Sequence, residues 1–205
     1  MLKPNARGKM KTLRKMVLMG VGLAVATGWA SAALGQVAAL DPAVLAKANA
    51  GDAAAQVAAG DHFAQTAAMA TDRDEAADNW KQAIAFYQKA ADQGFVAGEL
   101  HLADCYRDGR GVARDKVKAA EWYRKGADQG DAGAQGTLAM LYSMGQGVPQ
   151  SDVEAYFWFD LAAAVKTANQ DRYIANRQNV GTRITADELE AVQERVKKWK
   201  AAHPR

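Results

Sequence analysis

The sequence predicts an all-α protein, built as a solenoid of stacked helix–turn–helix repeats. Segments of similar sequence recur at an interval of 36 residues, and the apolar residues within each copy follow helical spacing. Only four prolines interrupt the 205 residues, which suits a helical chain. Because the chain has a single cysteine, an intramolecular disulfide is excluded, and stability has to come from the packing of apolar faces.

The repeat is visible in near-identical segments. Residues 89–94 read KAADQG and residues 125–130 read KGADQG. Aromatic residues recur at the same offset, at Phe86, Trp122 and Trp158. A less regular copy begins at Gly51 and carries seven more residues than the later copies. We therefore divide residues 51–165 into three repeats, with the boundaries 51–93, 94–129 and 130–165.

Each repeat reads as two helices joined by a turn. In the second repeat, residues 96–107 place Leu102 and Tyr106 one helical turn apart on the same face. The following GRGV segment supplies glycines for a tight turn, and Asp115 is a suitable N-cap for the next helix. The apolar stripe of that second helix is formed by Ala119, Trp122 and Tyr123.

The combined pattern resembles the Sel-one-like repeat (SLR), a relative of the tetratricopeptide repeat. Residues 94–129 contain Leu-x-x-x-Tyr, then Gly-x-Gly-Val, then Lys-Ala-x-x-Trp-Tyr, in the order typical of this repeat. The resemblance implies a right-handed α-solenoid whose first helices line its concave side, and a scaffold or adaptor role. The first repeat lacks the glycine turn and carries an acidic-leaning segment, residues 66–79, whose order stays open. We expect the acidic residues of this segment in a solvated loop: Asp72, Asp74 and Glu75.

Capping helices are predicted at both ends of the repeats. Residues 36–50 contain Asp41-Pro42, an N-cap followed by proline in the first turn of a short helix. Residues 166–205 are interpreted as a degenerate fourth repeat, with a helix over 170–178, followed by a terminal capping helix. The sequence Thr185-Ala-Asp-Glu188 is a capping box for that last helix. Its apolar stripe is formed by Leu189, Val192, Val196 and Trp199.

The first 35 residues have the parts of a secretory signal peptide that is removed on export. A basic segment precedes an apolar run at 17–30, and small residues at 30–32 or 33–35 suit cleavage. The alternative is an uncleaved anchor in the inner membrane, because the apolar stretch can be extended to 19 residues. We expect a bacterial periplasmic or secreted protein, with membrane attachment only through an uncleaved leader.

The charge distribution argues against nucleic-acid binding. The whole chain has 26 basic and 23 acidic residues, but six of the basic residues and none of the acidic ones lie in residues 1–35. The remaining body therefore has 20 basic and 23 acidic residues. A mildly acidic body offers no basic surface for a phosphate backbone.

The residues that could support chemistry fit a structural role better. His62 and Cys105 occupy equivalent repeat positions, but the third equivalent is Leu141, which indicates packed core. Two candidate ligands are too few for a closed metal site, and no common catalytic motif is present. We predict a non-catalytic protein without cofactor or metal. The enzymatic alternative is the β-lactam-binding or hydrolysing type known among exported relatives of the repeat, but their paired cysteines are missing here.

A partner is expected along the concave side. With the apolar residues of each first helix turned inward, the residues facing a partner are Asp61, His101, Asp104, Asp108, Met140 and Met144. Carboxylates, one histidine and two methionines suit a protein or peptide segment of the cell envelope better than a polyanion. The alternative is that these are ordinary solvated positions. The sequence thus predicts an exported adaptor, with a membrane-anchored regulatory protein as a further alternative.

Overall fold

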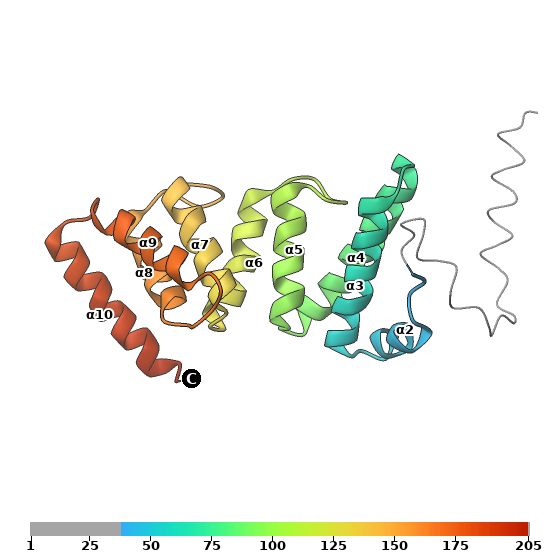
Figure 1. Ribbon diagram of the computed structural model, residues 1–205, viewed down its shortest axis with the longest axis horizontal. Helices are drawn as coiled ribbons and strands as arrows, with labels where there is room; N and C mark the ends of the chain where they lie inside the picture. Colours follow the sequence, from blue (N-terminus) through green and yellow to red (C-terminus); the bar gives the residue numbers. More distant parts are fainter. Residues whose placement is uncertain (1–37, 205) are drawn as a thin grey trace, which may run out of the picture. The chain divides into compact units, whose positions relative to one another are not determined.

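The computed structural model describes residues 38–204, and every regular element in this range is an α-helix (Figure 1). The elements are α2 (Pro42–Asn49), α3 (Ala53–Met69), α4 (Arg73–Asp92), α5 (Val96–Asp108), α6 (Lys116–Asp128), α7 (Ala132–Met144), α8 (Asp152–Ala163), α9 (Gln170–Gly181) and α10 (Ala186–Ala202). The predicted leader lies outside the described residues, so signal peptide and anchor both remain predictions. None of the helices described is long and apolar enough to cross a membrane.

The helices stack in chain order. Helices α3 and α4, α5 and α6, and α7 and α8 form antiparallel pairs, and successive pairs pack through α4 on α5 and α6 on α7 (Figure 1). Helix α9 packs on α8, and α10 also returns to α8. This arrangement confirms the predicted α-solenoid. The repeat boundaries stay a prediction, and the three helix pairs fall inside them.

Small residues at the helix contacts let the repeats pack closely. Ala83, Ala119 and Ala155, which are 36 residues apart, are all fully buried. Gly98 at the start of α5 lies against α4, and a Cβ added there would come within 2.7 Å of the Ala90 Cβ. At the end of α5, Gly109 adopts a left-handed conformation with φ 75°, which caps the helix and begins the turn.

The segment 66–79 differs from the expected loop. Helix α3 continues to Met69 and α4 begins at Arg73, so the extra residues lengthen both helices of the first repeat. Asp72 is the N-cap of α4, and its side chain accepts hydrogen bonds from the backbone N–H groups of Asp74 and Glu75. The three acidic residues are exposed as predicted, but the loop was wrong for Asp74 and Glu75, because an alanine-rich stretch favours helix and Asp72 supplies a helix start.

The helices that flank the repeats begin with side-chain caps. Asp41 accepts a hydrogen bond from the Ala43 N–H at the start of α2, with Pro42 in the first turn. Thr185 and Glu188 complete the capping box of α10. Val192 and Val196 are buried against the rest of the core, so α10 covers the last repeat.

A buried polar residue recurs at the same position of each repeat. Equivalent residues near the start of the first helices are Gln56, Glu99 and Gln135. Gln56 accepts a hydrogen bond from Gln93 Nε2 at 2.8 Å, and Glu99 accepts the equivalent bond from Gln129 at 2.8 Å. The amides of Gln56 and Gln135 also donate to backbone carbonyls of the preceding helices, Ala48 and Ala127, both at 3.1 Å. In the first two repeats these side chains therefore tie the start of the first helix to the end of the second, and the Gln135 amide ties the third repeat to the second.

Candidate functional site

The residues predicted to face a partner all lie on first helices. Asp61 is on α3, three of the residues are on α5, and Met140 and Met144 are on α7. We call the side formed by α3, α5, α7 and α9 the first-helix face. Two hollows open beside these residues, with volumes of about 200 and 220 Å³. The structure therefore gathers the predicted residues around two separate places.

The polar hollow lies where α3 and α4 meet α5. Its lining includes three predicted residues, Asp61, His101 and Asp104, together with Trp80, Tyr87 and Arg110. The Tyr87 hydroxyl donates a hydrogen bond to Asp61 Oδ1 at 2.8 Å, and His101 Nε2 lies 3.4 Å from the same oxygen. The His101 ring stacks on Tyr87 with ring centres 4.8 Å apart. Burial, and then the bond to Asp61, raise the pKa of the Tyr87 phenol, which stays a donor.

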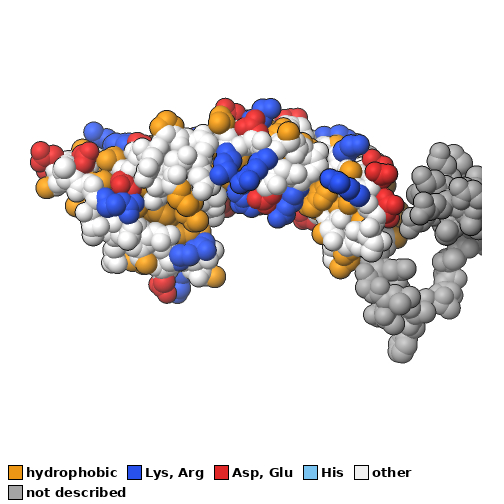
Figure 2. Space-filling view, turned by 90° about the horizontal axis from the view of Figure 1, so that it is seen from above, with side chains coloured by type: hydrophobic (Ala, Val, Ile, Leu, Met, Phe, Trp, Pro, Cys, Tyr) orange, Lys and Arg blue, Asp and Glu red, His pale blue; other side chains and the backbone are white. Residues whose placement is uncertain are grey.

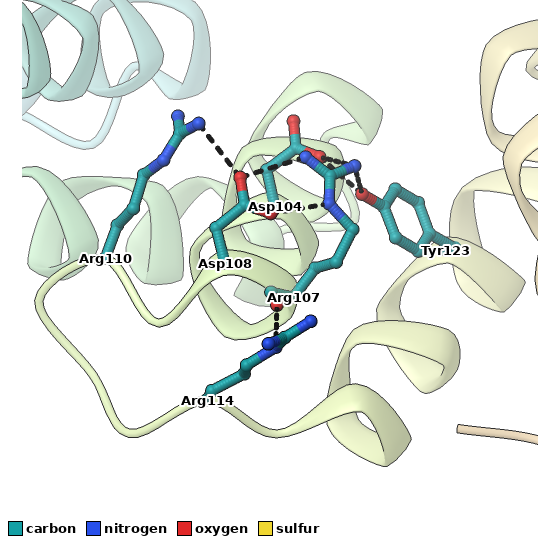
Figure 3. Close-up of polar contacts among 6 residues, drawn as sticks. All are labelled: Asp104, Arg107, Asp108, Arg110, Arg114 and Tyr123. Carbon is teal, nitrogen blue, oxygen red and sulfur yellow. Dashed lines mark hydrogen bonds and ion pairs between the residues drawn. The ribbon is translucent and has the colours of Figure 1, made fainter. Parts of the chain in front are cut away.

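Asp104 and Asp108 are held in a network with arginines (Figure 3). Asp104 accepts a hydrogen bond from the Tyr123 hydroxyl and lies 2.7 Å from Arg107 Nη1. The Arg107 guanidinium also donates to Asp108 at 2.8 and 3.0 Å, and these bonds lower the pKa of the Asp108 carboxyl. Arg110 lies 2.9 Å from the second Asp108 oxygen. Both carboxylates therefore have internal cationic partners, which sequence spacing alone did not reveal.

The carboxylate and the tyrosine form a unit that repeats. Asp61 and Asp104 are equivalent, and so are Tyr87 and Tyr123, which donate to them. In the third repeat these positions hold Met140 and a phenylalanine, so both polar groups are replaced together. A single replacement would leave a hydroxyl without its acceptor, which costs stability at a buried position. At this pair of positions the protein is therefore polar in the first two repeats and apolar in the third.

The methionine hollow lies between α7 and α9. It is lined by Met140, Met144, Phe159, Val180, Ser143, Asn176 and Asn179. Phe159 and Val180 are buried, whereas Met140 is 38% and Met144 is 50% exposed. Figure 2 shows hydrophobic side chains gathered in a recess over the C-terminal helices, and Lys and Arg side chains over the middle helices. Sequence reasoning missed the asparagines because α9 was considered only as a degenerate helix.

The two residues considered for metal binding or thiol chemistry, Cys105 and His62, differ in burial. Cys105 is 2% exposed, and burial raises the pKa of its thiol to about 11, so the thiolate that a nucleophile needs is scarce at neutral pH. His62 is half-buried and stacks edge-on against Phe63. The packed-core interpretation thus fits Cys105 but was wrong for His62, which lies at the margin. No group of three potential metal ligands occurs among residues 38–204.

Comparison with known proteins identifies the repeat. The Sel1 repeat matches residues 79–95, 96–131 and 133–164. A Sel1 repeat protein from Oxalobacter formigenes has a similar structure, with a TM-score of 0.55, 27% identity, and coverage of 67% of this chain and 96% of that one. The protein c5321, a protective antigen of uropathogenic Escherichia coli displaying an SLR fold, gives a TM-score of 0.54 at 22% identity.

The match to c5321 covers 77% of this chain and 40% of the length of c5321. It therefore concerns the fold alone. A search of curated proteins found no match. Sel1 repeats generally mediate protein–protein interaction and are typically parts of non-catalytic scaffolds.

Proposed function

We propose that this chain, which contains three Sel1 repeats, is an exported, non-catalytic adaptor that holds another cell-envelope protein against its first-helix face. The observation that carries this proposal is the grouping of five of the six predicted residues around two hollows on that face. The sixth, Asp108, is bonded to Arg110, which lines the polar hollow. Interfaces are typically enriched in methionine, arginine and aromatic side chains of this kind.

Export is the second part of the proposal, and it rests on the sequence of residues 1–35. The mass of the mature chain, purified from cells, tests it. We expect the loss of roughly 32–35 residues, as cleavage after the small residues would give. A full-length chain that sediments with membranes would instead support the inner-membrane anchor.

Affinity capture from a gently solubilised envelope extract tests the adaptor role. We expect the chain to retain a discrete partner, and the double variant Met140→Ser/Met144→Ser to lose it. Met69→Ser is the matched control, since Met69 is 53% exposed and lies at the end of α3, away from the residues that line the methionine hollow. A partner that all three proteins retain equally would place the interface elsewhere, and capture of nothing would contradict the proposal.

A further inference from the structure

The first-helix face changes character along the solenoid. Its N-terminal part presents the polar hollow, whose walls include Asp61 and the Trp80 and Tyr87 rings. Its C-terminal part presents the methionine hollow, where Met140 and Met144 remain substantially exposed. Helix α5 lies between these two ends (Figure 1). A ligand that follows the face would therefore meet a carboxylate at one end and an apolar recess at the other.

The methionine hollow is suited to an apolar side chain. Its floor is formed by buried Phe159 and Val180, and its rim by two flexible thioether side chains that adapt to the shape of a guest. The core does not need both methionines at this rim, because Asp104 occupies the position equivalent to Met140 in the preceding repeat. Exposed apolar side chains grouped around a recess are typical of an interaction site.

Asparagine side chains beside the hollow suit the backbone of an extended segment. Asn176 is half-buried and lines the hollow with Asn179, one turn further along α9. An asparagine amide has donors and an acceptor, and can therefore pair with both the C=O and the N–H of one residue in an extended segment. Asn179 already accepts a hydrogen bond from Arg183 Nη1 at 2.6 Å, which leaves Asn176 as the better placed of the two.

The charge at the other end favours a cationic side chain. Asp104 and Asp108 are both paired with Arg107. Within residues 38–204, in contrast, the contacts of Asp61 are with the Tyr87 hydroxyl and the His101 ring, which is neutral unless protonated. Asp61 therefore presents a carboxylate that no Lys or Arg side chain of the described residues pairs with. Arg110, which lines the same hollow, is paired with Asp108 and lies over the Trp80 ring.

We propose that the first-helix face binds an extended peptide segment of the partner, with an apolar side chain in the methionine hollow and a Lys or Arg side chain at Asp61. This inference rests on the proposed adaptor function and names the class of segment that it holds. Two steps between neighbouring helices of the face span on the order of 20 Å. An extended chain covers that distance with roughly six residues, which sets the spacing between the basic and the apolar residue.

Selection of peptides from a random 12-residue phage library on the full chain tests the proposal. We expect enriched peptides to contain a basic and an apolar residue about six positions apart. The binding of the strongest peptide, synthesised with a fluorescent label, is then measured by fluorescence anisotropy. Met140→Ser/Met144→Ser and Asp61→Asn should each weaken it by about tenfold, the loss expected for a contact that contributes substantially to binding.

The controls separate this inference from the proposed function. Met69→Ser and Glu121→Gln alter an exposed methionine and an exposed carboxylate elsewhere, and should leave the affinity unchanged. Replacing the basic residue of the peptide by glutamine should abolish the effect of Asp61→Asn. The inference would be overturned if no peptide is enriched. It would also be overturned if the affinity of the enriched peptides is unchanged by the substitutions at Asp61 and at the two methionines. The adaptor function would still stand if the capture experiment succeeds.

Discussion

Replacing Glu99 by glutamine should stabilise the protein at neutral pH. Glu99 is 3% exposed on α5, and its equivalents in the neighbouring repeats are both glutamine. Those glutamine amides donate to a backbone carbonyl eight residues earlier in the chain. The equivalent carbonyl for position 99 is that of Ala91, to which an ionised carboxylate has no hydrogen to give. The variant Glu99→Gln restores this donor and keeps an acceptor for Gln129.

The direction of the pH dependence follows from the pKa of Glu99. Burial raises this pKa above its ordinary value of 4.5, although Lys125 and the Gln129 hydrogen bond counteract part of the rise. The folded protein therefore binds this proton more tightly than the unfolded chain does. The resulting contribution to stability is complete below pH 4.5 and is lost as the pH rises through the folded-state pKa. Glu99→Gln should remove this dependence.

The expected gain comes from one added buried hydrogen bond and from the loss of a buried charge. A buried hydrogen bond is worth about 1 kcal/mol, so the free energy of unfolding should rise by at least that amount at pH 7. For a domain of this size, 1 kcal/mol raises Tm by roughly 2–4 °C. Thermal unfolding followed by circular dichroism at pH 4.5 and pH 7 measures both effects. The difference between the variant and the wild type should be larger at pH 7.

The reverse substitution is the matched control. Gln56→Glu puts a carboxylate at the equivalent position of the first repeat, and should lower Tm at pH 7 more than at pH 4.5. A Glu99→Gln variant that is less stable than the wild type at pH 7 would refute the reasoning. The attraction between Glu99 and Lys125 would then outweigh the burial of the carboxylate.

Three further predictions concern the same helices. Tyr123→Phe and Asp104→Met should each lower the free energy of unfolding by about 1 kcal/mol. The double variant reproduces the Met–Phe pair of the third repeat, so a double-mutant cycle in urea should show a loss smaller than the sum of the two. Additive losses would contradict the paired role. Cys105 should resist iodoacetamide at pH 8 in the folded protein and react once urea unfolds it, because it is buried with a pKa of about 11; rapid labelling of the native chain would contradict this. Thr185→Ala should lower the free energy of unfolding by about 1 kcal/mol because it removes the capping box, and Thr185→Ser should keep most of that stability. Equal Tm values for the wild type and both variants would show that the capping box does not stabilise α10.

The solenoid could be predicted because each repeat contains residues typical of helix ends. Asp115 caps α6 through hydrogen bonds to two backbone N–H groups, as its place before an apolar stripe indicated. The segment 66–79 could not be placed in the same way. This segment has no counterpart in the other repeats, so its helices could not be predicted by comparison with them. They follow instead from the helix propensity of its own residues.

The side-chain networks of the first-helix face were harder to predict. Asp104 was expected to face outward, and it does so only in part, because it also accepts a hydrogen bond from a tyrosine 19 residues away. The alignment of the repeats does indicate this contact, because the two equivalent positions hold Asp and Tyr in two repeats and Met and Phe in the third. The asparagines of α9 had no such signal, because they lie in a helix without a regular repeat. Long-range contacts of this kind need the folded structure.

The adaptor role is tested most directly by site-specific photo-crosslinking in living cells. A photoreactive residue at Met144, which is 50% exposed at the methionine hollow, would be compared with one at Lys198, on the exposed side of α10. Met144 is preferred to Asp104 because the Asp104 side chain is bonded to Tyr123 and Arg107. We predict a discrete adduct with one envelope protein from position 144 and none from position 198. No adduct from 144, or the same adducts from both positions, would contradict binding at the first-helix face.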